Sequence, residues 1–171
     1  MATPKPPKAP KDTITIKIED QDIFAILRTF KNMDQIASKD LRDVAQELAG
    51  EVANALQAAA SFADANGGNS RQASAVAQTI KVNRDRVPNL SIGGSKGVTS
   101  SNAPAGVILF GSEFGSNKYK QFPKRSPKDG RGNAGYWLFP TLRMMQPRIR
   151  EKWVQGVDKI REEWRGRNNI G

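Results

Sequence analysis

Four carboxylates at helical spacing are the residues of this chain whose types and positions could do chemistry. They follow one another at steps of three, four and four residues: Asp40, Asp43, Glu47 and Glu51. On a helix such a set faces one direction, and a metal-dependent nuclease or small hydrolase could use it if groups from elsewhere converged there. Lys39 and Arg42 lie beside these carboxylates, however, and favour a solvated helix face, so we expect no enzymatic activity.

Composition limits the remaining chemistry. The 171 residues include no cysteine and no histidine, which excludes disulfides, thiol nucleophiles, thiolate or imidazole zinc sites and imidazole-based catalysis. A carboxylate-only metal site or a serine–lysine pair remains possible, but no spacing indicates either. The segment from Gly93 to Gly97 includes Lys96, but its order differs from the G-x-x-x-x-G-K-[ST] of a phosphate-binding loop, so it predicts a hairpin turn. We expect no cofactor.

Basic and aromatic side chains crowd the segment from Phe110 to Pro140. It contains two acidic residues, five glycines and six basic residues: Lys118, Lys120, Lys124, Arg125, Lys128 and Arg131. The whole chain is skewed in the same way, because residues 1–117 hold 13 Lys and Arg against 12 Asp and Glu, whereas residues 118–171 hold 14 against five. This asymmetry in a net charge of +10 points to a polyanion or an acidic partner, with a merely basic and soluble surface as the equal alternative.

Periodic patterns in the first half of the chain predict the elements that position these residues. Thr13 to Ile18 alternates apolar and polar residues like a half-buried strand, and Ile23 to Phe30 is apolar enough for a short packed helix. A long helix is predicted from about Asp34 to Ala65, ended by the glycines that follow it. Its apolar stripe recurs every three or four residues: Leu41, Val44, Ala45, Leu48, Val52, Ala55, Leu56, Ala59 and Phe62.

The second half is predicted to alternate short elements before a final helix. We expect a short helix at 70–78, strands at 79–83 and 90–92, and an apolar strand covered on both faces from Val107 to Phe110. The last helix begins near Pro140, which suits a first turn, whereas Pro147 should kink it or mark a restart. Its apolar face follows the same spacing: Leu142, Met145, Ile149, Trp153, Val157, Ile160 and Trp164.

These elements predict one α+β domain at residues 13–165, in which a small antiparallel sheet packs against a long central helix and a C-terminal amphipathic helix. Residues 116–135 form its basic loop and residues 166–171 a flexible tail. The four prolines within residues 1–12 predict a polyproline II or disordered arm, either a floppy terminus or an arm that reaches a neighbouring subunit. That stretch holds no secretory signal, and the longest apolar run is too short to span a membrane, so we expect a cytoplasmic protein.

Two motifs resemble the tail-completion or head–tail joining proteins, the tail terminator-like neck proteins, of long-tailed bacteriophages. Glu113-Phe114-Gly115 looks like that family's Glu-Phe-Gly motif. Trp137 to Leu142 looks like its aromatic–Pro–Ala–Leu start of the last helix, with Thr141 in place of the alanine. The long helix also matches in place and polarity, so the resemblance covers roughly residues 13–165. The chain departs from the family in its longer, more basic segment at 116–135 and in Pro147.

The resemblance implies a structural virion protein without catalytic activity. Such a subunit assembles in the host cytoplasm as a ring, expected to be a hexamer, between the head connector and the tail tube. The resemblance leaves open whether this is the terminator of the tail tube or an adaptor nearer the head. DNA passes through the channel of the ring, so non-specific phosphate contacts would explain the basic excess, and docking on an acidic neighbouring ring would explain it equally well.

Our hypothesis for residues 116–135 is a subunit-linking or lumen-facing loop that aromatic residues clamp at each end. Four aromatic residues are expected to be buried in the domain or between subunits: Phe110, Phe114, Trp137 and Phe139. Three others are expected to make partly hydrated contacts at an interface: Tyr119, Phe122 and Tyr136. The candidate interface thus comprises six aromatics: Phe114, Tyr119, Phe122, Tyr136, Trp137 and Phe139. The six basic residues of the segment would meet phosphates or carboxylates; a purely solvated connection is the alternative.

A sequence-independent nucleic-acid-binding module is the rival function, because it would share the charge and the aromatic residues. No recognition-helix motif, zinc pattern or RNA-binding sheet signature is present to favour it.

Overall fold

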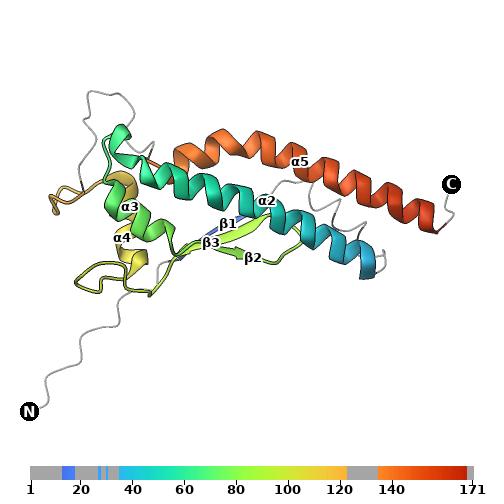
Figure 1. The fold of residues 1–171 in the computed structure, drawn as a ribbon, viewed down its shortest axis with the longest axis horizontal. Coiled ribbons are helices and arrows are strands. Elements are labelled where there is room, and N and C mark those ends of the chain that lie inside the picture. The colour runs from blue at the N-terminus through green and yellow to red at the C-terminus, as the bar shows by residue number, and fades with distance from the viewer. Residues whose placement is uncertain (1–12, 18–26, 28–29, 31–34, 123–134, 169–171) are drawn as a thin grey trace, which may run out of the picture.

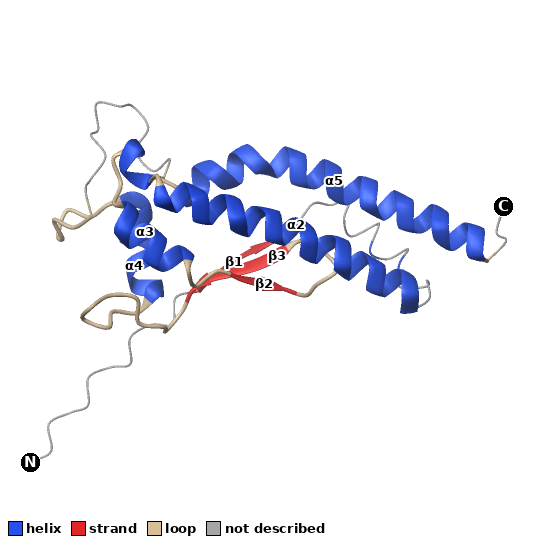
Figure 2. Ribbon diagram, viewed as in Figure 1, coloured by secondary structure: helices blue, strands red, loops and turns tan. Residues whose placement is uncertain are grey.

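The computed structural model describes residues 13–17, 27, 30, 35–122 and 135–168 of the chain. Within them, two long antiparallel helices lie side by side along the molecule, and a small sheet lies against one of them (Figures 1 and 2). The elements follow in the order β1 (Thr13–Lys17), α2 (Gln35–Ser61), the 3-10 helix η1 (Ala63–Asn66), α3 (Ser70–Ala77), β2 (Lys81–Asn83), β3 (Asn89–Gly93), α4 (Ala105–Phe114) and α5 (Leu138–Arg167). The predicted α+β class, with its long helix and its C-terminal helix, is confirmed.

The sheet has the strand order β1-β3-β2, and both pairings are antiparallel. Ile14 lies opposite Ile92, and Ile16 lies opposite Leu90. These four side chains belong to the core or pack against it, whereas the residues of β1 that alternate with them are exposed. The alternation of apolar and polar residues that predicted this strand therefore matches the alternation of half-buried and exposed side chains along it.

Helices α2 and α5 pack along their predicted apolar stripes. The buried residues of α2 include Leu41, Ala45, Leu48, Val52 and Leu56, and those of α5 include Ile149, Trp153, Val157 and Ile160. The two backbones approach closely at Gly156, where a β-carbon would lie 2.7 Å from Val44 Cγ1.

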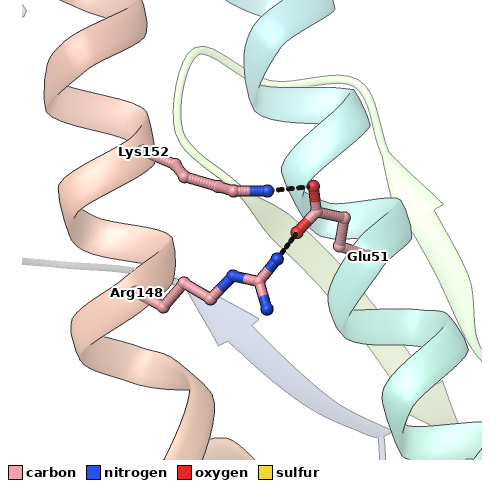
Figure 3. Close-up of polar contacts among 3 residues, drawn as sticks. All are labelled: Glu51, Arg148 and Lys152. Atoms are coloured by element: carbon pink, nitrogen blue, oxygen red, sulfur yellow. Dashed lines mark hydrogen bonds and ion pairs between the residues drawn. The ribbon is translucent and has the colours of Figure 1, made fainter.

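An ion pair on the surface crosses from α5 to α2. Lys152 Nζ lies 2.6 Å from Glu51 Oε1, and the Arg148 guanidinium lies 4.0 Å from Glu51 Oε2 (Figure 3). Both cations come from the same side of α5, one turn apart, so a single carboxylate of α2 meets two positive charges.

The expected burial of Phe62 is wrong, since 71% of its surface is exposed. Helix α2 ends at Ser61, earlier than predicted, and the chain continues as the 3-10 helix η1. Because the helix type changes here, Ala60 and Ala63 face the core and are buried, whereas Phe62 faces solvent. Gly67, with a φ of 81°, then ends η1 in the left-handed conformation predicted for the glycines here.

The prediction of an apolar strand from Val107 to Phe110 is also wrong, because these residues lie within the helix α4. A run of four apolar residues does not distinguish a strand from a buried helix, and the flanking residues decide here. The loop after β3 folds back through a bridge between Gly97 and Pro104, and Pro104 becomes the N-cap of α4. The segment from Gly93 to Gly97 therefore leads into this loop and not into a hairpin between two strands.

Helix α5 is continuous through Pro147, so the predicted restart does not occur. Pro140 is its third residue and lies in the first turn, where a proline costs no hydrogen bond.

Two further predictions fall largely outside the described residues. Of the helix expected at 23–30, only Leu27 and Phe30 are described; both are helical, and Phe30 is buried in the core. The arm at residues 1–12 lies wholly outside.

Candidate interaction site

A buried carboxylate joins the end of α4 to the start of α5. Glu113, in the last turn of α4, is only 1% exposed. Its Oε2 accepts hydrogen bonds from the backbone N–H groups of Trp137 at 3.1 Å and Leu138 at 2.8 Å, and its Oε1 accepts from Phe139 at 2.9 Å. The backbone carbonyl of Glu113 also accepts from the N–H of Tyr136 at 2.9 Å. Glu113 therefore caps α5 from a different helix.

The local sequence requires this distant cap. The first N–H groups of a helix lack partners within it, and Trp137 at the N-cap position of α5 supplies no side-chain acceptor. A carboxylate at this end is also favoured by the helix dipole. Gly135 has a φ of 82°, and a β-carbon there would lie 1.8 Å from Glu113 Oε1. A glycine at this position is what allows the carboxylate to reach the helix.

Two opposing effects act on the ionisation of Glu113. Burial raises the pKa of its carboxyl group above the ordinary value, because the charged form loses its water. Hydrogen bonds from the backbone N–H groups at the start of α5 lower the pKa, since they stabilise the charged form, but burial is the larger effect. The joint thus contains a carboxylate whose charge the surrounding backbone only partly compensates.

Aromatic side chains surround the joint. Phe114 stacks on Phe139 with ring centroids 5.6 Å apart and an interplanar angle of 26°. Tyr136 and Trp137 are each 1% exposed. The predicted burial of Trp137 is confirmed. The partly hydrated interface position expected for Tyr136 is wrong, because its side chain packs against the turn at Gly68.

Hydrogen bonds hold both ends of the segment at 116–135. On the first side, the N–H of Ser116 donates to the carbonyl of Phe122 at 3.0 Å, which closes a small turn, and Asn69 Nδ2 donates to the carbonyl of Gln121 at 2.8 Å. On the other side, Asn66 Nδ2 donates to the carbonyl of Tyr136 at 3.0 Å. The connection between α2 and α3 thus contacts the described residues on both sides of 123–134.

A groove of about 520 Å³ runs along α4 next to this turn. One side follows a stripe at steps of four, three and four residues: Ala103, Val107, Phe110 and Phe114. Tyr119 lies on the other side, and Phe122 packs against Gly111, where a β-carbon would meet its ring at 2.9 Å. We call this surface the α4 groove.

The α4 groove changes two expectations about exposure. Phe110 was expected to be buried but is 47% exposed, because the helical conformation turns it away from the side of α4 that holds Ile108 and Leu109. Phe122 was expected to be half-wet but is 5% exposed, since it packs against Gly111. Tyr119, at 50% exposure, is the candidate aromatic that offers the most surface to a partner.

The basic residues of the candidate site are only partly described. Lys118 and Lys120 are exposed, and Lys118 Nζ lies 5.4 Å from the centre of the Tyr119 ring. The other four lie outside the described residues: Lys124, Arg125, Lys128 and Arg131. The described turn at 116–122 lies at the end of the molecule opposite the C-terminus of α5 (Figure 1).

Two of the four carboxylates of α2 are paired with basic side chains. Asp43 Oδ1 lies 2.7 Å from Arg84, and Glu51 takes part in the ion pairs with α5. No group of three or more metal-ligating side chains comes together in the described ranges. Nor does any helix among these residues have the length and apolar character needed to cross a bilayer.

The fold and the site define a small α+β protein that presents an apolar groove beside a basic turn at 116–122, which hydrogen bonds hold in place. Comparison of the chain with protein-family models, with curated proteins and with solved structures finds no match in any of the three. The resemblance to phage joining proteins therefore rests on the two motifs and on the long helix.

Reasoning from the sequence missed the role of Glu113 and the existence of the α4 groove. Only part of the signal for Glu113 was present: the start of the last helix has no capping side chain of its own, but the sequence does not show which distant acidic residue supplies the cap. The signal for the groove was the spacing of Ala103, Val107, Phe110 and Phe114, which fits a helix better than a strand.

Proposed function

We propose that this protein is a structural subunit of a long-tailed bacteriophage, which forms a ring and joins the head connector to the tail tube around the DNA channel. The observation that carries the proposal is the joint at Glu113. The two segments that resemble the family are separated by 21 residues, yet the first caps the second through three hydrogen bonds. A shared structural task explains why both segments would occur in one chain.

The joint also suits the proposed task mechanically. A subunit in a ring must hold its contact surfaces in fixed positions against its neighbours, because small errors accumulate around the circle. Here the carboxylate of Glu113 and the amides of Asn66 and Asn69 hold the two ends of the loop at 116–135. The basic side chains of that loop would then meet either phosphates in the channel or carboxylates on an adjoining ring.

Native mass measurement tests this proposal. The purified protein should form rings, expected to be hexamers, either alone at high concentration or when tail tubes of the same virus are added as a template. Alanine replacement of Lys124, Arg125, Lys128 and Arg131 together should impair the joining of heads to tails while leaving the folded subunit intact by circular dichroism. A chain that remains monomeric with and without tail tubes contradicts the proposal.

A sequence-independent nucleic-acid-binding module is the second candidate function, and the charge favours it. Residues 118–171 carry nearly all of the net charge of +10, and Lys118 and Lys120 are exposed. In that case the monomer would bind duplex DNA tightly, with an affinity that falls steeply as salt rises, and would form no ring. The same mass measurement, repeated with DNA, separates the two candidates.

A further inference from the structure

The α4 groove is a large apolar surface that the described part of the chain leaves open. Three of its lining side chains are about half exposed: Val107 at 49%, Phe110 at 47% and Tyr119 at 50%. Its volume of about 520 Å³ lies within the roughly 300–1,000 Å³ typical of binding sites. Grooves lined by aromatic side chains are the surfaces that recognise extended, proline-rich segments.

The first twelve residues of this same chain, MATPKPPKAPKD, carry a matching pattern. Polyproline II has three residues per turn, so side chains at every third position share a face. One face would carry three prolines: Pro4, Pro7 and Pro10. A second face would carry three lysines: Lys5, Lys8 and Lys11. Such a segment presents an apolar ridge on one side and positive charge on another.

We infer that residues 1–12 of this chain bind in the α4 groove as a polyproline II segment. The ridge of three prolines lies against Val107, Phe110 and Tyr119, and the lysine face remains in solvent. Tyr119 and Gln121 line the groove, and their hydroxyl and amide groups are of the kind that donates to backbone carbonyls, which polyproline II leaves without internal partners. Because proline restricts the free segment, little conformational entropy is lost on binding.

The chain leaves the sheet at a position from which this segment reaches the groove. Thr13 pairs with Gly93 at the end of β1, and the next carbonyl, that of Gly94, accepts a hydrogen bond from the N–H of Gly106 at 2.9 Å. Residue 13 is therefore tied to the first turn of α4. Nine residues of polyproline II extend about 28 Å, whereas the ten residues of α4 span about 15 Å. The segment is long enough to follow the groove from end to end.

This inference does not depend on the proposed function, because it requires neither a ring nor DNA. The occupant is the same whether the segment belongs to the same copy or to a neighbouring one. Contact within one chain would cover the apolar groove, and contact between copies would link them.

A peptide titration tests the contact directly. The receptor is the full chain in which Pro4, Pro7 and Pro10 are replaced by alanine, so that its own segment no longer competes. A labelled synthetic peptide with the sequence of residues 1–12 should bind this receptor, measured by fluorescence anisotropy. The matched control is a peptide with Pro6→Ala, which removes a proline from a different face and should bind within about twofold of the unaltered peptide.

Two changes should weaken this binding by about tenfold or more. One is a peptide in which Pro4, Pro7 and Pro10 are all alanine. The other is the substitution Phe110→Gln in the receptor, which keeps a good helix former at a half-exposed position and so preserves the fold. Raising the salt concentration should change the affinity little, because the lysine face makes no contact. Failure of the unaltered peptide to bind at millimolar concentration, or equal binding by all three peptides, overturns the inference.

Cross-linking in the full chain provides a second measurement. The chain has no native cysteine, so only the introduced cysteines can react. A short bis-maleimide should couple Ala9→Cys to Val107→Cys in high yield, as a shifted monomer or as a dimer. It should couple Ala9→Cys poorly to Glu162→Cys, an exposed position on α5. Equal yields in the two pairs overturn the inference. So does groove-to-groove pairing of two copies, which would give Val107→Cys dimers without any coupling to residue 9.

Discussion

Removal of the Glu113 carboxylate should destabilise the chain more than any surface change. In Glu113→Ala, the N–H groups of Trp137, Leu138 and Phe139 lose their acceptor. A buried donor left unpaired costs about 1–3 kcal/mol, so the two buried donors, those of Trp137 and Leu138, cost at least about 2 kcal/mol, and the part-buried donor of Phe139 adds less. Relief of the desolvated charge, which burial otherwise penalises, offsets part of this cost. We expect a net loss of about 2–4 kcal/mol, a large share of the stability of a small domain.

Urea unfolding followed by tryptophan fluorescence measures this loss, since Trp137 and Trp153 are both buried. Glu113→Gln retains one acceptor oxygen and should lose about half as much. The control is Glu151→Ala, at an exposed position whose carboxylate accepts a long hydrogen bond of 3.3 Å from Gln155, and it should stay within about 0.5 kcal/mol of the wild type. Equal unfolding midpoints for Glu113→Ala and Glu151→Ala would refute the capping argument.

Three further tests concern the packing and the charges. Gly156→Ala places a methyl group 2.7 Å from a side chain of α2 and should cost about 1–3 kcal/mol in urea unfolding, whereas Gly166→Ala, with open space around it, should gain up to about 1 kcal/mol. The opposite order would contradict the close approach of α2 and α5. Glu51→Gln should cost no more than about 1 kcal/mol, and less in about 1 M salt, because its ion pairs are on the surface. Since burial raises the pKa of Glu113, the part of the stability that is linked to its protonation is complete below about pH 4.5 and is lost as the pH rises through the folded pKa. The stability difference between wild type and Glu113→Gln should therefore shrink as the pH rises through that window, and a growing difference would contradict the direction of the pKa shift.

The elements with long periodic patterns could be predicted from the sequence, and the short ones only in part. Helices α2 and α5 repeat their apolar residues over many turns, so the helical period is unambiguous, and β1 alternates strictly. The run from Val107 to Phe110 is too short to reveal its period. Its conformation depends on Pro104 and on the fold-back of the preceding loop, which are tertiary features.

The candidate site was predicted in its parts but not in its geometry. The aromatic and basic residues around the loop at 116–135 stand out by composition alone. Their exposure could not be predicted, because it depends on which glycine a ring packs against: Gly68 receives Tyr136, and Gly111 receives Phe122. The capping role of Glu113 depends on a contact over 24 to 26 residues, which no local pattern encodes.

Helix α4 connects the α4 groove to the joint at Glu113, because its two sides make different contacts. Glu113 and Leu109 face the interior, where Glu113 fixes the start of α5 and the far end of the basic loop. Val107 and Phe110 face outward along the α4 groove, whose other wall is the near end of that loop. A segment bound in the groove would therefore contact the turn at residues 116–122, which includes Lys118 and Lys120. Helix α4 therefore connects the groove, through the described turn at 116–122, to the joint at Glu113.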